Sequence, residues 1–311
     1  MKVALLAGGT GGAKLAHGFA ALRPAVELSV IVNVGDDTEL HGLHVSPDID
    51  SIVYTLAGLL DREQGWGVAG DTRTALGMLE RLGAERTWFQ VGDADLATHV
   101  RRTQLLRDGA SLTDATAAMA GTLGIRARIL PATDDRLRTM VQTDAGELDF
   151  QEYFVGHRQA PAVTGIRLDG EATARASTAA LAAVREADLV VIGPSNPVVS
   201  IGPILALGEL REAVAAQGAV AVSPIVAGRA LKGPADRMLA SLGEEVTAVG
   251  VARRYAGVAR TFVLDEADAG LAPQVAELGL EPRVLPTIMR NDADREALAR
   301  ALVEGGGILT R

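Results

Sequence analysis

The chain has no cysteine and few aromatic residues, and both shortages narrow its chemistry. Without cysteine there can be no disulfide, no thiolate metal site and no cysteine nucleophile, so any metal ion must sit on oxygen or imidazole ligands. Aromatic residues form only 3% of the 311 residues although 48% are hydrophobic, so the apolar content is mostly Ala, Val, Leu and Ile. That mixture is typical of buried parallel strands covered by helices, and it favours an α/β fold.

Positive charge and long apolar runs are also scarce. Thirty basic residues stand against 39 acidic ones, and a net charge of -9 has the wrong sign for wrapping a nucleic-acid backbone, although a nucleotide-sized ligand remains allowed. The first apolar run is too short for a signal peptide or a membrane span, and the longest apolar region, 187–207, is interrupted by Pro194, Pro197 and Pro203. We therefore expect a cytoplasmic protein that binds neither nucleic acid nor membranes.

The hydrophobic pattern predicts a strand over Val3 to Ala7, a glycine-rich turn, a helix from Ala13 to Leu22 and a second strand over Leu28 to Val32. Further segments follow along the chain. We predict helices over 49–60, 71–82, 96–106, 112–123 and 292–303, strands over 87–91, 189–192, 220–222 and 260–264, and a hairpin formed by 138–143 and 147–155.

These segments predict a single domain over 1–311 with a Rossmann-like, doubly wound core. We expect residues 1–60 and 185–311 to form that core. Residues 61–184 should form an inserted region that is largely helical and carries the β-hairpin.

A glycine-rich loop, Gly8 to Lys14, lies where the first strand meets the first helix. At this position a glycine backbone can approach a phosphate and present N–H groups to it, so Gly9, Thr10, Gly11, Gly12 and Lys14 are candidate ligand contacts. The loop matches neither a Walker A motif nor a GxGxxG fingerprint. The alternative is that its glycines only allow close packing of strand and helix.

Four carboxylates follow the second strand. Asp36 and Asp37 come directly after it, and Asp48 and Asp50 lie at the expected start of the next helix. Hard oxygen ligands at the ends of neighbouring strands suit Mg²⁺ paired with the phosphates of a nucleotide. The alternative is that Ser46 or Asp48 caps the helix begun by Pro47, while Asp36 and Asp37 form a solvated turn.

A second acidic motif, Asp93-Ala94-Asp95, precedes a helix that carries His99, Arg101 and Arg102. One acid is expected to cap the helix and the other to bind. A lone histidine on such a helix is more often a hydrogen-bonded structural residue than a catalyst. The two arginines are expected either to contact phosphate or to lie on the surface.

Two proline-containing loops follow later strands. Ser195 and Asn196 lie between Pro194 and Pro197, in a loop that would face the glycine loop if their strands are neighbours, and base or sugar recognition competes there with a structural turn. Lys232 follows the next strand, and it is either a donor-phosphate contact or an exposed lysine.

Taken in order, the motifs resemble the 2-phospho-L-lactate transferase family over nearly the whole chain. The matching segments are Gly8 to Lys14, Asn33 to Asp37, Ser46 to Asp50, Gly65 to Gly67, Gly92-Asp93, Phe150 to Glu152, Gly193 to Pro197 and Ser223 to Val226.

The resemblance implies a magnesium-dependent transferase of coenzyme factor 420 biosynthesis, often a homodimer. Such an enzyme moves a phosphorylated three-carbon acid from a guanosine-diphosphate-linked donor to 7,8-didemethyl-8-hydroxy-5-deazariboflavin and releases GMP. It also implies that Asp36 and Asp48 bind the metal, and that Asp50 and Gln90 lie near the deazaflavin. Asp50 is in addition the candidate for accepting the acceptor's hydroxyl proton.

By the same resemblance, the glycine loop, Ser195 and Asn196 contact the donor. The chain departs from the family at two positions, since Ala94 stands where many relatives have arginine and Gln90 where some have lysine. A regulatory ligand-binding protein of the gluconeogenesis-factor type is the competing interpretation. An NAD-dependent dehydrogenase fits the glycine spacing poorly.

Overall fold

The computed structural model describes residues 1–305, and its centre is a seven-stranded sheet in the order β14-β13-β10-β9-β1-β2-β5. Every neighbouring pair in this sheet is parallel. The strands are β1 (Lys2–Ala7), β2 (Glu27–Val32), β5 (Arg128–Pro131), β9 (Leu189–Ile192), β10 (Ala219–Val222), β13 (Ala259–Asp265) and β14 (Glu281–Leu285).

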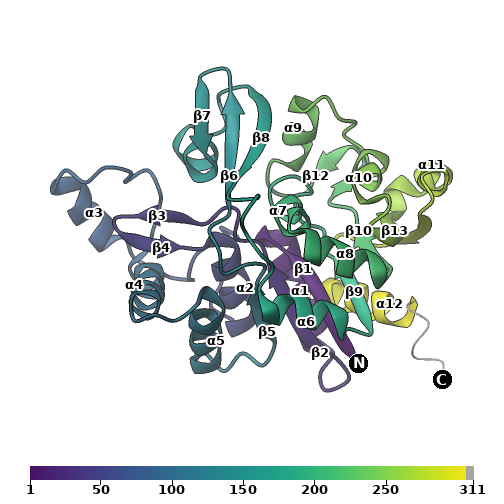
Figure 1. The fold of residues 1–311 in the computed structure, drawn as a ribbon, viewed down its shortest axis with the longest axis horizontal. Coiled ribbons are helices and arrows are strands. Elements are labelled where there is room, and N and C mark those ends of the chain that lie inside the picture. The colour runs from purple at the N-terminus through teal and green to yellow at the C-terminus, as the bar shows by residue number, and fades with distance from the viewer. Residues whose placement is uncertain (306–311) are drawn as a thin grey trace.

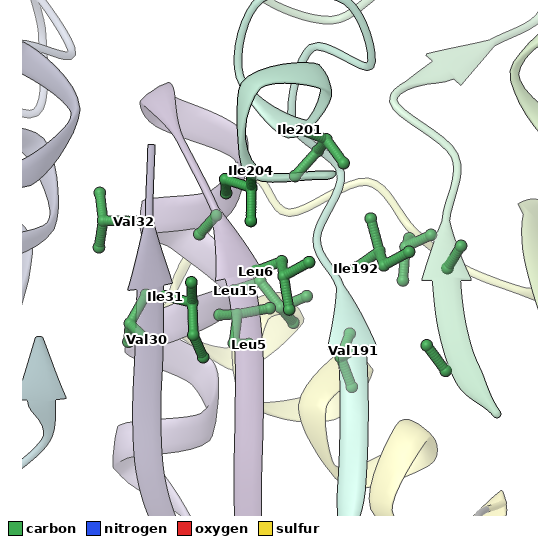
Figure 2. Packing of buried hydrophobic residues seen from close by; sticks show 14 of the residues in the cluster. Leu5, Leu6, Leu15, Val30, Ile31, Val32, Val191, Ile192, Ile201 and Ile204 are labelled. Carbon is green, nitrogen blue, oxygen red and sulfur yellow. The ribbon is translucent and has the colours of Figure 1, made fainter. Parts of the chain in front are cut away.

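The central strands are apolar on both sides because helices cover both faces of the sheet. Leu5, Leu6 and Ile192 have no exposed surface, and Figure 2 shows their side chains packed between β1, β9 and the neighbouring helices. Burying a leucine or isoleucine side chain contributes roughly 1.5–3 kcal/mol. The near-continuous apolar runs of the sequence therefore correspond to strands buried on both faces, which confirms the predicted α/β class.

The helices form two groups. In one, α1 (Gly9–Ala21) packs against α2 (Pro47–Ala57) and α12 (Asp292–Gly305). In the other, α6 (Thr178–Arg185) packs against α8 (Gly208–Ala216), and α10 (Ala248–Tyr255) packs against α11 (Ala272–Glu277). Two short helices, α7 (Ile201–Ala206) and α9 (Ala235–Ser241), and the 3-10 helix η2 (Glu266–Leu271) complete the core.

The direction of the chain across the sheet reverses between β1 and β9. After β1 the chain moves to β2 and then β5, whereas after β9 it moves the opposite way to β10, β13 and β14. The connections that follow β1 and β9 therefore lead in opposite directions across the sheet, from two neighbouring loops at its carboxyl end. In open α/β sheets this switch point is where ligands bind.

Two additions lie outside the main sheet (Figure 1). One consists of the hairpin β3 (Thr38–Leu40) and β4 (Leu43–Val45) with α3 (Thr74–Arg81), α4 (Asp93–Arg107) and α5 (Leu112–Thr122). The other is an antiparallel sheet of β6 (Arg138–Thr143), β7 (Gly146–Asp149) and β8 (Val163–Asp169), together with the π-helix η1 (Glu152–Gly156). A separate small hairpin joins β11 (Ile225–Val226) to β12 (Arg229–Ala230).

Two local predictions differ from the structure. Residues 87–91, expected as a strand, form turns and irregular chain. Val91 is buried against Leu40 and Val45, but no strand within residues 1–305 pairs with this segment. The second half of the expected hairpin strand, 150–155, turns into η1 after β7 ends. In addition, residues 61–184 include β5, which belongs to the main sheet. This core strand lies between the two additions along the sequence.

Among residues 1–305, no helix has both the length and the apolar composition that crossing a bilayer requires.

Candidate active site

A cavity of about 970 Å³ opens at the carboxyl end of the sheet, over the switch point between β1 and β9. This volume is near the upper end of the usual range for small-molecule sites. Ten of the eleven residues predicted as site residues line it: Gly9, Thr10, Gly11, Lys14, Asp36, Asp48, Asp50, Gln90, Ser195 and Asn196. The eleventh, Gly12, does not line it and lies against Ala7 and Ser195.

The glycine loop forms the first turn of α1, with Gly8 as its N-cap and no side chain capping the helix. The loop packs tightly against the loop after β9. A Cβ on Gly11 would overlap the carbonyl oxygen of Pro194, and one on Gly12 would lie 2.7 Å from Ser195 Oγ. Glycine is therefore required there for close packing, which is the whole role that the structure gives to Gly12. Gly11 meets the packing requirement and also faces the cavity.

Two other side chains of the loop reach across the cavity edge. The Thr10 hydroxyl donates to the carbonyl oxygen of Gly65 over 3.4 Å, and Lys14 Nζ donates to the carbonyl oxygen of Met289 over 2.9 Å. Burial lowers the pKa of Lys14, and the positive charges of Arg295 and Lys232 lower it further. This corner of the cavity is therefore electropositive, which suits an anionic ligand group.

Asp36 and Asp48 lie side by side, and both accept hydrogen bonds from the side-chain amide of Asn33. Asn33 Nδ2 donates to Asp48 Oδ2 over 2.9 Å and to Asp36 Oδ1 over 3.3 Å, and the N–H of Gly9 donates to Asp48 Oδ1 over 2.5 Å. Both carboxylates are buried, with 6% of each residue exposed. Asn33 is a residue that the sequence motif contained but that we did not predict as part of the site.

Burial raises the pKa of Asp48 to about 6, against hydrogen bonds from Asn33 and Gly9 that favour its charged form. Burial also raises the pKa of Asp36 well above its ordinary value, and the negative charges of Asp48 and Asp37 raise it further. Two buried carboxylates facing one cavity with so little compensating charge fit the oxygen ligand set of Mg²⁺.

The alternatives of helix capping and a solvated turn do not hold for these acids. Asp37 is 1% exposed and accepts hydrogen bonds from His44 Nε2 over 2.9 Å and from Ser46 Oγ over 3.0 Å. Ser46 is the N-cap residue of α2, but its hydroxyl is turned to Asp37 and caps nothing. Asp48 is directed towards α1 rather than along its own helix.

A third group of polar side chains joins α2 to α4. Asp50 is clamped by both terminal nitrogens of Arg102, which is 1% exposed. The His99 ring lies between two acids, with Nδ1 3.6 Å from Asp50 Oδ2 and Nε2 3.5 Å from Asp95 Oδ1. The Tyr54 hydroxyl donates to Asp95 Oδ1 over 2.7 Å. Asp50, Asp95, His99 and Tyr54 all line the cavity.

Neither prediction for Arg102 is correct, because this arginine is neither at the surface nor free for a phosphate. Its neighbour Arg101 is the exposed one and is bonded to Gln104 over 2.9 Å. Asp95, His99 and Arg102 have the i, i+4, i+7 spacing that places side chains on one helical face. This spacing is the sequence signal that could have identified the group.

The prediction that one acid of 93–95 caps the helix that follows is wrong, because Asp93 caps a different helix, and the prediction that the other acid binds stays a prediction, with Asp95 on the cavity wall. Asp93 accepts from the backbone N–H groups of Thr74 and Ala75 and so caps α3. The hydrogen bond from the Thr72 hydroxyl, followed by these backbone hydrogen bonds, lowers the pKa of Asp93 to about 2. The first turn of α4 is instead bonded to Asp71.

Ser195 and Asn196 hold the loop after β9 in place. Ser195 Oγ accepts the N–H of Gly8 over 3.1 Å, and Asn196 Oδ1 accepts the N–H groups of Val198 and Val199 over 2.9 and 3.3 Å. Because β1 and β9 are neighbours, this loop faces the glycine loop, as predicted. Both residues thus have structural bonds in addition to their places on the cavity wall.

Part of the cavity wall is aromatic. Phe150 and Phe154 stack with ring centroids 5.5 Å apart, and Trp66 remains 43% exposed at the wall. Gln90 is exposed at the same cavity, and Lys232 also lines it. Flat apolar surface beside charged groups suits a ligand that has both an aromatic and an anionic part.

Comparison with known proteins gives a consistent result. The family model described as 2-phospho-L-lactate transferase CofD matches residues 3–279. The chain is 37% identical to the 2-phospho-L-lactate transferase of Methanosarcina mazei, with 96% of this chain and 99% of that protein covered. It is 40% identical to the phosphoenolpyruvate transferase of Streptomyces griseus, with 98% of each covered.

Among solved structures, a member of the UPF0052 family from Bacillus halodurans superposes with a TM-score of 0.61 at 15% identity, with 97% of this chain and 98% of that one covered. At this identity the likeness concerns the fold alone.

Proposed function

The chain belongs to the 2-phospho-L-lactate transferase family, and from this premise we propose that it transfers a phosphorylated three-carbon acid from a guanosine-diphosphate-linked donor to a deazaflavin alcohol in coenzyme factor 420 biosynthesis. The observation that carries the proposal is the convergence of the glycine loop, Ser195, Asn196, Asp36 and Asp48 on one cavity at the switch point. The names of the relatives support the transferase class.

The proposed reaction needs no nucleophile from the protein. The acceptor's hydroxyl oxygen attacks the phosphorus that bears the acid, the bond from that phosphorus to the bridging oxygen breaks, and GMP leaves with the bond's electron pair. The hydroxyl proton goes to a base or to water. Reactions of this kind depend mainly on positioning and on stabilising negative charge.

The protein's groups divide between these tasks. The electropositive corner at Lys14 would hold the donor's anionic part, and the first turn of α1 offers backbone N–H groups to it. Asp36 and Asp48 would hold a magnesium ion, which when bound neutralises phosphate charge. The stacked Phe150 and Phe154 would contact the acceptor's ring system.

Asp50 remains the proposed acceptor of the hydroxyl proton. Its carboxylate lines the cavity, but Arg102 engages both oxygens, so the carboxylate would act within a fixed ion pair.

The test is a magnesium-containing assay with the deazaflavin acceptor and each of three guanylylated donors, carrying lactate, enolpyruvate or glycerate. GMP release and the mass of the acceptor product are followed together. Conversion with one donor would establish the reaction and its substrate. If no donor is converted while guanosine diphosphate still binds, the transferase proposal fails and a regulatory nucleotide-binding role replaces it.

A further inference from the structure

The buried carboxylates of the site have very unequal partners. Asp36 and Asp48 share the amide of Asn33, whereas Asp50 has a guanidinium of its own. Arg102 is among the largest side chains of the chain with almost no exposed surface, and its Nη1 also lies 3.5 Å from the carbonyl oxygen of His44 and from His99 Nδ1. Burying an arginine beside a cavity wall costs free energy unless a partner compensates its charge.

The pairing fixes one orientation of Asp50. A guanidinium that bonds both carboxylate oxygens sets the plane of the carboxylate as well as its position, which a single hydrogen bond or a lysine cannot do. Asp50 lies on α2 and Arg102 on α4, and the two residues are 52 positions apart in the sequence. The pair therefore also fixes the spacing between the core and the added helices.

The pair lies on one side of the cavity. The neighbours of Asp50 are His99, Asp95 and Tyr54, all from α2 and α4. The glycine loop bonds Asp48, two residues before Asp50 on α2, and has no hydrogen bond to Asp50. Arg102 therefore acts on the part of the cavity away from the glycine loop.

We propose that Arg102 is a positioning residue that holds Asp50 in the orientation needed to engage the acceptor's hydroxyl group, and that it has no part in binding the donor. This inference rests on the proposed function, because it assigns Arg102 to the acceptor half of the same site. Arg102 itself does not line the cavity, so its effect on the reaction passes through Asp50.

The main experiment compares Arg102→Lys with Arg101→Lys. Both changes keep the positive charge, but only the first removes the paired hydrogen bonds to the two oxygens of Asp50. Arg101, at the next position of α4, is exposed and bonds Gln104 instead. We expect Arg102→Lys to lower kcat with saturating donor about 100-fold, the cost typical of a reacting group displaced by about 1 Å. The acceptor KM should rise, while binding of guanosine diphosphate and all parameters of Arg101→Lys stay unchanged.

A second pair of variants separates positioning from folding. Arg102→Met leaves Asp50 buried without its partner and is expected to lower the melting temperature, whereas the double variant Asp50→Asn with Arg102→Met removes both charges and should regain it. The double variant also lacks Asp50, so only its melting temperature is informative, and turnover is measured on Arg102→Met at a temperature where that variant is fully folded. If the ion pair only stabilises the fold, turnover there will equal that of the wild type. We expect it to stay low.

The outcomes distinguish this inference from the proposed function. A wild-type chain that converts no donor defeats the proposed function. An active wild type with Arg102→Lys retaining full kcat and acceptor KM overturns the positioning role alone. Equal loss of guanosine diphosphate binding and acceptor turnover in Arg102→Lys would also overturn it, because the effect would then not be confined to the acceptor half.

Discussion

The backbone N–H of Gly9 donates to Oδ1 of Asp48 across 2.5 Å, so the first turn of α1 and the first turn of α2 meet at one carboxylate. The glycine loop and the acidic motif, 39 residues apart, therefore form one structural unit. A ligand bound at the glycine loop would lie directly beside the carboxylates of Asp48 and Asp36.

Gly11→Ala should disrupt the contact between the loops after β1 and β9. The added methyl group would overlap the carbonyl oxygen of Pro194, and we expect destabilisation by about 1–3 kcal/mol together with weaker binding of guanosine diphosphate. Gly77→Ala is the matched control, because Gly77 lies in α3 with nothing within 4 Å of an added Cβ. It should stabilise the chain by about 0.5–1 kcal/mol in urea unfolding. Equal behaviour of the two variants would contradict the packing argument.

Folding stability in the absence of divalent ions should fall as the pH rises from about 4 to about 6. Asp48 has a pKa of about 6 in the folded chain against an ordinary 3.8, so the folded state binds its proton more tightly and is favoured at the acidic end of this range. The difference corresponds to at most roughly 3 kcal/mol for Asp48. Thermal unfolding over pH 4–8 measures it, and Asp48→Asn should reduce the pH dependence without removing it, because the raised pKa of Asp36 acts in the same direction.

Magnesium should reverse this loss at neutral pH. An ion that binds only the folded chain at 100 times its Kd stabilises by about 2.7 kcal/mol, and it requires deprotonated carboxylates. We expect MgCl2 to raise the melting temperature more at pH 7.5 than at pH 5, with NaCl at equal ionic strength as the control. The same rise in Asp48→Asn would rule out Asp48 as a ligand.

Two buried tyrosines should respond in opposite ways to loss of their hydroxyl groups. Tyr54 donates to the Asp95 carboxylate over 2.7 Å, so Tyr54→Phe should cost about 1.5–3 kcal/mol, the range for a hydrogen bond to a charged group. The hydroxyl of Tyr255 is buried with no partner in the structure, so Tyr255→Phe should be neutral or stabilising. Urea unfolding of both variants gives the comparison, and a larger loss for Tyr255→Phe would contradict it.

Lys14→Gln should weaken binding of guanosine diphosphate about 10- to 100-fold, the equivalent of one charge-assisted hydrogen bond, without changing binding of the deazaflavin. The reason is that Lys14 lines the electropositive corner of the cavity with Lys232 and Arg295 nearby. Isothermal titration measures both affinities. Lys2→Gln, at an exposed lysine paired with Glu186, is the control and should change neither. A loss confined to deazaflavin binding would place the donor elsewhere.

Much of the fold follows from short-range patterns. The strand, glycine turn and helix at the N-terminus, and the start of α2 at Pro47, lie where periodicity and turn chemistry predict them. These features depend on which residues alternate and which can adopt a turn, and both are local. The strand predicted over 87–91 failed for the same reason, since local alternation cannot show whether a partner strand exists.

The residue types of the site were also visible in the sequence, because glycines and carboxylates directly after buried strands lie at the edge of an α/β sheet where ligands bind. The sequence did not show which of these residues line the cavity and which only hold the fold together. Whether Asp37 is solvated, whether Gly12 faces a ligand or a neighbouring strand, and whether Arg102 is at the surface all depend on contacts with distant segments.

The sequence by itself determined the class of fold, five of the seven core strands and the loops that carry chemistry, because strand burial and turn formation are encoded within a few residues. It did not identify β5 and β14. Only the tertiary structure decided that Gly8 bonds to Ser195 across 187 residues and that Asp50 is clamped by Arg102 across 52. The physical reason is that a charge or an N–H group needs a protein partner only after folding has removed it from water. Packing, rather than proximity in sequence, decides which residue becomes that partner.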